Sequence, residues 1–161
     1  MEGVKRTIRR RRKQGKTDYK ARIGFLKSGK ARIVVRKTNR YVLGQIVVSD
    51  VAQDKVLVGA NSRELLSLGW PKEATGSLKS LPACYLTGFL LGKKSNEIKE
   101  GVFDIGLNRN IKKSRLYAFL KGVLDAGIQI PHDEKVLPDY ESFKKNEKVG
   151  KDLDKIKENI K

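Results

Sequence analysis

The stretch that decides the fold is residues 31–49, ARIVVRKTNRYVLGQIVVS. Two runs rich in β-branched residues, 31–37 and 41–49, flank the turn residues 38–40, a pattern that predicts an antiparallel hairpin. A third run, KVLVGA at 55–60, follows after a short turn. Because connections this short join antiparallel neighbours, the sequence predicts a three-strand meander.

Helical periodicity replaces the strand pattern after residue 60. The strongest signal lies at 114–126, where apolar residues recur at i, i+3, i+4, i+7 and i+8, as on the core-facing side of an amphipathic helix. Before it, Pro82 is well placed in the first turn of a long helix, and Gly101 precedes a fourth strand. The expected elements are a short helix at 63–68 capped by Ser62, a helix at 82–97, a strand at 102–107, the helix at 114–126 and a short edge strand at 128–130.

This order of elements predicts an α/β fold with a mixed sheet. The first three strands form an antiparallel meander, and the fourth joins the sheet through a helical crossover. Strand, strand, strand, helix, strand, helix resembles the ribonuclease H-like topology. At 161 residues, 39% of them hydrophobic, the chain supports a single domain. We place that domain at 17–138, between a basic N-terminal arm at 1–16 and a helical C-terminal tail at 139–161.

The two flanks carry local signals of their own. Thr17 can cap a short helix at 18–27, which Ser28 and Gly29 would end. The tail alternates charged residues around a thin apolar stripe, Val149, Leu153, Ile156 and Ile160. Since that stripe is too narrow to bury much, we expect a charged, solvated helix packed lightly on its neighbours. A helix dedicated to binding a partner is the alternative.

Positive charge is concentrated in the first quarter of the chain. Residues 1–40 hold 16 Lys or Arg and two acidic side chains, a net charge of +14 out of +18 for the whole chain. A localised basic arm indicates a polyanionic partner. Between Lys5 and Lys16 the only aliphatic residue is Ile8, so the arm lacks the apolar face that a membrane-surface helix needs.

Nucleic acid fits the arm because the planar guanidinium of arginine binds a phosphate through two hydrogen bonds and stacks on bases. A localisation signal or a solubilising tract is the alternative. The basic residues continue into the predicted domain, which favours nucleic acid. We expect the arm alone to be disordered and to become ordered on RNA, because it cannot bury apolar surface.

Composition indicates a cytoplasmic setting. Cys84 is the single cysteine, so an internal disulfide is impossible and a reducing compartment is expected. The longest apolar run, 82–91, is far short of the roughly 20 residues that span a bilayer. The charged N-terminus does not lead into a signal-peptide core.

Residues for catalysis or metal binding are scarce. His132 and Cys84 are the only residues of their types, so the usual zinc ligand sets cannot form, and the sequence has no phosphate-loop or dinucleotide-binding glycine motif. The rival is a ribonuclease H-like nuclease, but two-metal cleavage needs converging carboxylates and the first strand has none. We expect Asp104 to pair with basic residues or backbone donors and not to form a metal pair with Asp125. The predictions are no enzyme, no cofactor and no metal.

Basic and polar residues also gather at two predicted turns. The first hairpin offers cations and an amide, with Tyr41 available to stack on a base or ribose. The loop after the fourth strand leads into the last helix, where cations and helix N-terminal amides together make an anion site. For each cluster taken singly, a solvated turn is the alternative. The candidate RNA-binding residues are Arg9, Arg10, Arg11, Arg12, Lys13, Lys16, Arg36, Lys37, Asn39, Arg40, Tyr41, Asn108, Arg109, Asn110, Lys112 and Lys113.

Seven strings carry a family resemblance. They are, in order, RRRRK, TDYKARIGFLKSGK, ARIVVRKTNRYVLGQIV, LGW, YLTGFLLG, VFDIGLNR and LKGVLDAGIQIPH. In order and spacing they resemble the archaeal-type large-subunit ribosomal protein that binds 5S rRNA, whose bacterial relative is numbered eighteen and whose eukaryotic counterpart is numbered five. The resemblance covers roughly residues 5–138.

The resemblance implies a structural role in the large ribosomal subunit. The family binds 5S rRNA and helps attach it to large-subunit (23S-type) rRNA in the central protuberance, beside neighbouring ribosomal proteins. It implies RNA contacts from the arm, the hairpin and the loop at 108–113, no small-molecule substrate and no membrane. A nonspecific nucleic-acid-binding protein stays open as an alternative, as does the nuclease.

Overall fold

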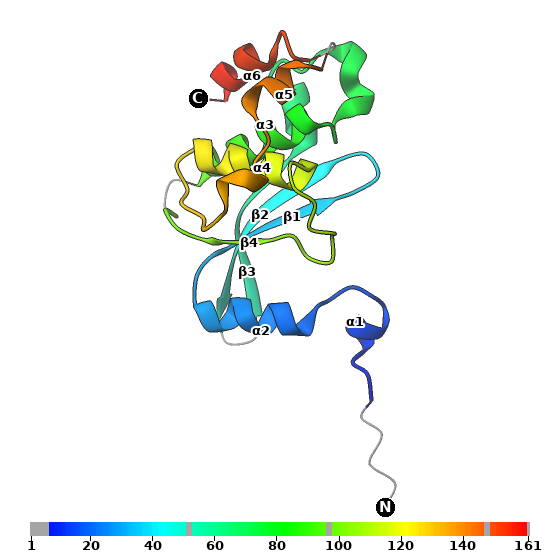
Figure 1. The fold of residues 1–161 in the computed structure, drawn as a ribbon, viewed down its shortest axis with the longest axis vertical. Helices are drawn as coiled ribbons and strands as arrows, with labels where there is room; N and C mark the ends of the chain where they lie inside the picture. Colours follow the sequence, from blue (N-terminus) through cyan, green and yellow to red (C-terminus); the bar gives the residue numbers. More distant parts are fainter. Residues whose placement is uncertain (1–6, 51–52, 96–97, 147–148, 161) are drawn as a thin grey trace, which may run out of the picture.

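A four-stranded sheet in the order β3-β2-β1-β4 is the centre of the fold (Figure 1). The computed structural model describes residues 7–50, 53–95, 98–146 and 149–160. β1 pairs antiparallel with β2, β2 pairs antiparallel with β3, and β4 lies parallel to β1. The predicted meander, crossover and mixed α/β fold are therefore confirmed. The strands are β1 (Arg32–Lys37), β2 (Val42–Asp50), β3 (Gln53–Asn61) and β4 (Val102–Asp104).

The fourth strand is shorter than predicted. It ends at Asp104, whose carboxylate accepts a hydrogen bond from the backbone N–H of Gly106 at 2.7 Å. Gly106 has a φ of +63°, a left-handed conformation that suits glycine and ends the extended strand. The predicted edge strand at 128–130 is reduced to one parallel bridge between Glu100 and Gln129.

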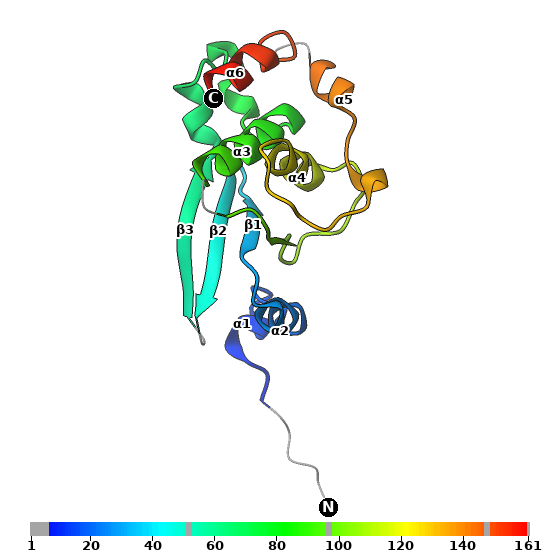
Figure 2. The same ribbon diagram turned by 90° about the vertical axis from the view of Figure 1, so that its left-hand side faces the viewer.

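Helices lie on both faces of the sheet, and Figure 2 shows them near opposite ends of the strands. α3 (Leu81–Lys94) and α4 (Arg115–Asp125) pack on the face to which Ile33 and Val35 contribute fully buried side chains. Because successive strand residues point to opposite faces, Arg32, Val34 and Arg36 line the other face. That outer face looks toward α2 (Tyr19–Ser28).

Two predicted helix caps are wrong by one residue. The side chain that caps α2 is Asp18, which accepts hydrogen bonds from the backbone N–H groups of the first turn, because the Thr17 hydroxyl accepts one from Arg11 instead. The first 3-10 helix is capped by Asn61, because the Ser62 hydroxyl accepts the buried N–H of Val42 at 3.0 Å. Gly29, with a φ of +62°, ends α2 as predicted. The 3-10 helices are η1 (Ser62–Leu66), η2 (Lys72–Ser77) and η3 (Glu134–Val136).

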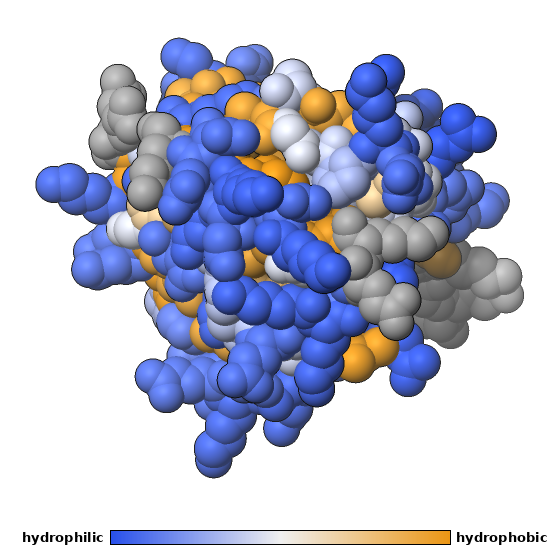
Figure 3. All heavy atoms as spheres, turned by 90° about the horizontal axis from the view of Figure 1, so that it is seen from above, coloured by the Kyte–Doolittle hydropathy of each residue, from blue (hydrophilic) through white to orange (hydrophobic). Residues whose placement is uncertain are grey.

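The tail is part of the core, so the prediction of a solvated, lightly packed helix is wrong. It forms α5 (Tyr140–Lys144) and α6 (Leu153–Asn159), and five of its apolar residues have exposed fractions of 7% or less. Every residue of α3 from 82 to 92 is buried, which requires cover on more than one side of that helix. Seen from the α5–α6 end, most of the surface is hydrophilic, and small apolar patches lie between the hydrophilic side chains (Figure 3). The buried tail residues are Phe143, Val149, Leu153, Ile156 and Ile160.

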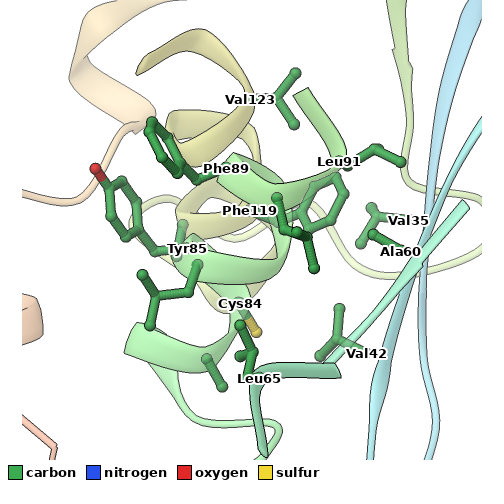
Figure 4. Packing of buried hydrophobic residues seen from close by; sticks show 14 of the residues in the cluster. Val35, Val42, Ala60, Leu65, Cys84, Tyr85, Phe89, Leu91, Phe119 and Val123 are labelled. Carbon is green, nitrogen blue, oxygen red and sulfur yellow. The ribbon is translucent and has the colours of Figure 1, made fainter. Parts of the chain in front are cut away.

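Glycines let α3 and α4 approach each other closely. A Cβ at Gly122 would lie 2.0 Å from the carbonyl oxygen of Tyr85, and one at Gly88 would lie 2.1 Å from that of Phe119. The close approach brings Phe119 and Leu91 onto the sheet residues in the core (Figure 4).

None of the described helices is long and apolar enough to cross a bilayer.

Replacing Gly122 by alanine should lower the free energy of unfolding by about 3 kcal/mol, because the new methyl group meets backbone atoms that cannot move aside. Urea unfolding followed by circular dichroism measures this loss. The control is Gly24→Ala in α2, where a Cβ meets nothing within 4 Å and helix propensity should add about 0.5–1 kcal/mol of stability. Equal effects at the two glycines would contradict the close helix packing.

Candidate nucleic-acid interface

The arm places its cations in the open. Its described part contains one helical turn, α1 (Arg10–Lys13), which has no buried residue. Arg11 Nε donates to the Thr17 hydroxyl at 2.9 Å, and the Arg9 guanidinium lies 4.7 Å from the ring centroid of Tyr19. Among the described residues, no carboxylate forms an ion pair with the arm cations at 9–13 or with Lys16. The disorder expected for the arm alone stays a prediction.

The turn between β1 and β2 presents a second group of exposed residues. It is closed by the Thr38 backbone N–H, which donates to the Tyr41 carbonyl at 2.8 Å, and by the Tyr41 N–H, which donates to the Thr38 hydroxyl at 2.9 Å. Lys37, Asn39 and Arg40 are exposed around this turn. The Tyr41 ring is half-buried, and the Arg63 guanidinium lies 5.2 Å from its centroid. The pattern of the sequence did not point to Arg63, which comes from η1.

Arg36 belongs to an ion-pair network and is not free. Its guanidinium donates to the backbone carbonyls of Val35 at 2.8 Å and Asp104 at 3.1 Å, and to the Asp104 carboxylate at 3.3 Å. Arg32 approaches the same carboxylate at 3.6 Å. Asp104 is therefore paired with basic residues and, at Gly106, with a backbone donor, as the sequence predicted.

Several candidate residues of the loop at 108–113 have structural partners. Asn108 donates to the Ile105 carbonyl at 2.7 Å, and Asn110 accepts a hydrogen bond from the Tyr117 hydroxyl. Lys113 pairs with Asp139 at 3.0 Å and lowers the pKa of that carboxyl. Arg109 and Lys112 are exposed, and neither has an ion-pair partner among the described residues. These two side chains are the cations of the loop best placed to meet a ligand.

Candidate residues of the arm and of the hairpin meet in one cleft. It lies between α2 and the outer face of the sheet, with a volume of about 390 Å³. Arg11 and Lys16 reach it from the arm, Arg36 from β1, and Gly106 from the start of the loop. The turn residues Asn39 and Arg40 and the loop candidates at 108–113 do not line it. Three further lining residues, Arg32, Gln45 and Phe25, were not predicted from the sequence, although alternation along β1 places Arg32 on the same face as Arg36.

Asp54 forms ion pairs with both sides of this cleft, α2 and the sheet. Its carboxylate accepts a hydrogen bond from Ser49 at 2.7 Å and pairs with Arg22 of α2 at 2.9 Å and with Arg32 of β1 at 2.7 Å. Partial burial opposes the charged form, but the hydrogen bonds from Ser49, Arg22 and Arg32 outweigh it and lower the pKa of Asp54 to about 2. The charged carboxylate therefore stabilises the attachment of α2.

Because the pKa of Asp54 is lowered in the folded chain, its contribution is complete above about pH 4 and is lost as the pH falls toward 2. The free energy of unfolding of the wild type should therefore fall over that interval by more than that of Asp54→Asn. Urea titrations at pH 5, 4, 3 and about 2 measure the difference. Parallel pH curves for the two proteins would contradict the role of Asp54.

The groups considered for catalysis are occupied by structural contacts. Cys84 is 1% exposed, and burial raises the pKa of its thiol to about 12. Asp125 accepts a hydrogen bond from the Tyr85 hydroxyl at 2.7 Å. In the described part of the chain, no three His, Cys, Asp or Glu residues come together as a metal-binding group.

The fold and these surfaces define a small α/β protein with a strongly basic arm and exposed cations on two turns. The family model described as "Ribosomal large subunit proteins 60S L5, and 50S L18" matches residues 5–101. The chain belongs to this family of ribosomal proteins, which is not a family of enzymes.

Archaeal relatives agree with this assignment over most of the chain. The protein is 44% identical over 151 residues to large ribosomal subunit protein uL18 of Korarchaeum cryptofilum (strain OPF8). The aligned region covers 92% of this chain and 75% of the relative. It is 47% identical to uL18 of Methanococcus maripaludis, over 82% of this chain and 67% of the relative. It is also 47% identical to uL18 of Methanoculleus marisnigri, over 84% of this chain and 76% of the relative.

Proposed function

We propose that this chain is a structural constituent of the large ribosomal subunit that binds 5S rRNA and helps attach it to 23S-type rRNA in the central protuberance, in the cytoplasm. Its membership of the large-subunit family supports the ribosomal role. The observation that carries RNA binding is the set of exposed cations in the arm, the hairpin turn and the loop that have no carboxylate partner among the described residues. Neighbouring ribosomal proteins are its other partners.

Residues 1–16 act as a binding arm and residues 17–138 as the docking domain, while the tail at 139–161 completes the core and contacts no RNA. Lys37, Arg40, Arg109 and Lys112 bind phosphates together with the arm. Asn39 and Tyr41 contact ribose or base edges. Arg36 acts with Asp104 and positions the start of the loop. No cofactor and no small-molecule substrate take part.

Affinity comes from counterion release and selectivity from the shape of the RNA. Six to ten phosphate contacts would make affinity fall by about 10³–10⁵ between 50 and 200 mM salt. The test is an equilibrium titration of the purified protein against 5S rRNA over a salt series, with transfer RNA and duplex DNA as competitors. Binding to 5S rRNA that survives an excess of both competitors supports the proposal. Equal competition by all three would leave a nonspecific nucleic-acid-binding protein.

Charge reversal at the hairpin turn provides a site-specific test. Lys37→Glu with Arg40→Glu should weaken 5S binding at least tenfold and reduce the steepness of the salt dependence by about 1.5–2, because two phosphate contacts are lost. The matched control is Lys145→Glu with Lys151→Glu in the tail, which changes the net charge equally. Equal losses in the two double variants would move the site away from the hairpin.

The likeness to the ribonuclease H-like topology stays a prediction, and a shared topology does not make an enzyme. Two-metal hydrolysis needs free converging carboxylates. Asp104 is held by Arg32, Arg36 and Gly106, and Asp125 by Tyr85. Incubation of 5S rRNA with the protein and Mg²⁺ should therefore leave the RNA intact.

A further inference from the structure

The cleft between α2 and the sheet is open because α2 does not pack directly on the strands. α2 has no buried side chain, and an ion pair between Arg22 and Asp54 joins it to β3. A helix that packs directly on a sheet buries an apolar stripe. The space left here, about 390 Å³, lies within the range of about 300–1,000 Å³ that is typical of small-ligand sites.

The lining combines apolar side chains with five cations and three carboxylates. Each carboxylate already has partners, since Asp18 caps α2, Asp54 pairs with Arg22 and Arg32, and Asp104 pairs with Arg32 and Arg36. Phe25 contributes an aromatic ring from α2, and Val34 and Val56 contribute aliphatic side chains from the sheet. A nucleotide has the matching two-part chemistry, since its base offers a flat face for stacking and its phosphate offers a negative charge. Arg11 and Lys16 are exposed cations of the lining, and Arg36, although it is paired with Asp104, keeps 44% of its side chain exposed.

Arg32 is a second, independent sign of a ligand at this place. Its side chain lines the cleft and is only 6% exposed. Its terminal nitrogens bind Ser49 at 3.2 Å and Asp54 at 2.7 Å, but its Nε has no hydrogen-bond partner among the described residues. Because a buried donor without a partner is costly, a group that carries acceptor oxygens would relieve this site on entering the cleft.

We propose that the cleft receives one unpaired nucleotide turned out of the bound RNA. The base lies against Phe25 and the aliphatic side chains of Val34 and Val56, and the phosphate lies among the cations of the arm and of β1. Unstacked bases of structured RNA are recognised in this way, by stacking and by phosphate contacts. This inference rests on the proposed binding of 5S rRNA. It goes beyond that proposal by assigning the cleft as the place where an extruded nucleotide binds.

Filling the cleft with a side chain tests the proposal without changing any charge. Gln45, which is exposed on the outer face of β2 and lines the cleft, is replaced by tryptophan. The matched control is Leu43→Trp, two residues away on the same face of β2 and outside the lining. Gln45→Trp should weaken 5S binding about tenfold, as expected for the loss of one stacked base, and Leu43→Trp by less than about twofold. Thermal unfolding of both variants checks that each retains the fold.

Photocrosslinking of the wild-type chain to 5S rRNA that carries 4-thiouridine gives an independent readout. Mass spectrometry should find crosslinked nucleotides on peptides from α2 and from the outer face of β1 and β2. A second variant, Phe25→Ala, should reduce this crosslinking while leaving crosslinks to the hairpin turn unchanged. Two results together would overturn the cleft proposal alone. They are selective 5S binding of equal affinity in the wild type and Gln45→Trp, and crosslinks confined to the hairpin turn and the loop. Failure of the wild type to select 5S rRNA would overturn the proposed function as well.

Discussion

Replacing Phe143 by alanine should lower the free energy of unfolding by about 3–5 kcal/mol. The side chain is fully buried, and its ring stacks on Tyr85 of α3 with centroids 4.8 Å apart. Tyr140 packs edge-on against the same ring at 5.8 Å. Truncation would leave a cavity between the tail and α3 that these rigid rings cannot close. Urea unfolding at neutral pH measures the loss.

The control for this prediction is an exposed residue of the same tail. The Lys155 side chain is 79% exposed, so Lys155→Ala should change the free energy of unfolding by no more than about 0.5 kcal/mol. If Phe143→Ala cost less than about 1 kcal/mol, the tail would not share the core. That outcome would restore the solvated helix that the charged sequence suggested.

Removing residues 1–16 should weaken 5S binding by about a hundredfold or more at moderate salt and leave the fold intact. The six described arm cations at 9–13 and 16 can each contact a phosphate, and each contact contributes about 0.7–0.9 to the salt dependence. The steepness should therefore fall by about 4–5. Titrations of the full chain and the truncated chain over the same salt series measure it.

The stability of the truncated chain provides the control. Because α1 buries no side chain, the urea midpoint should stay close to that of the full chain. A loss of cooperative unfolding would refute the separation of arm and domain. A salt dependence that did not change would show that the arm does not contact phosphates.

The sequence predicts best the elements whose signal is local. The hairpin follows from β-branched runs on either side of a short turn, and α4 from an apolar repeat that a single helix carries by itself. Caps were misplaced where two residues able to cap stand side by side. In both pairs a contact from outside the helix decides, since the Thr17 hydroxyl accepts a hydrogen bond from Arg11 and the Ser62 hydroxyl accepts one from Val42.

The tail and the cleft depend on residues far apart in the sequence. The four apolar residues of the tail stripe are too few to predict a packed helix from the sequence alone. In the structure they cover α3, whose residues 82–92 are all buried. The burial of Arg32 and the pairing of Arg36 with Asp104 depend on the parallel alignment of β1 with β4. A basic turn considered alone therefore predicts the exposure of Arg40 but does not predict that Arg36 pairs with Asp104.

The buried thiol gives the protein a natural reporter of its own opening. Cys84 is the only cysteine in the chain and lies in α3, between the sheet and the tail helices, with a pKa raised to about 12 by burial. A thiol reagent can react with it only when α3 is exposed, so the labelling rate measures the equilibrium for opening of the core. Labelling of the thiol can be followed without interference from the absorbance of nucleic acid. The same experiment can therefore be run on the free chain and on an assembled ribonucleoprotein, and the ratio of the two rates gives the protection that assembly confers.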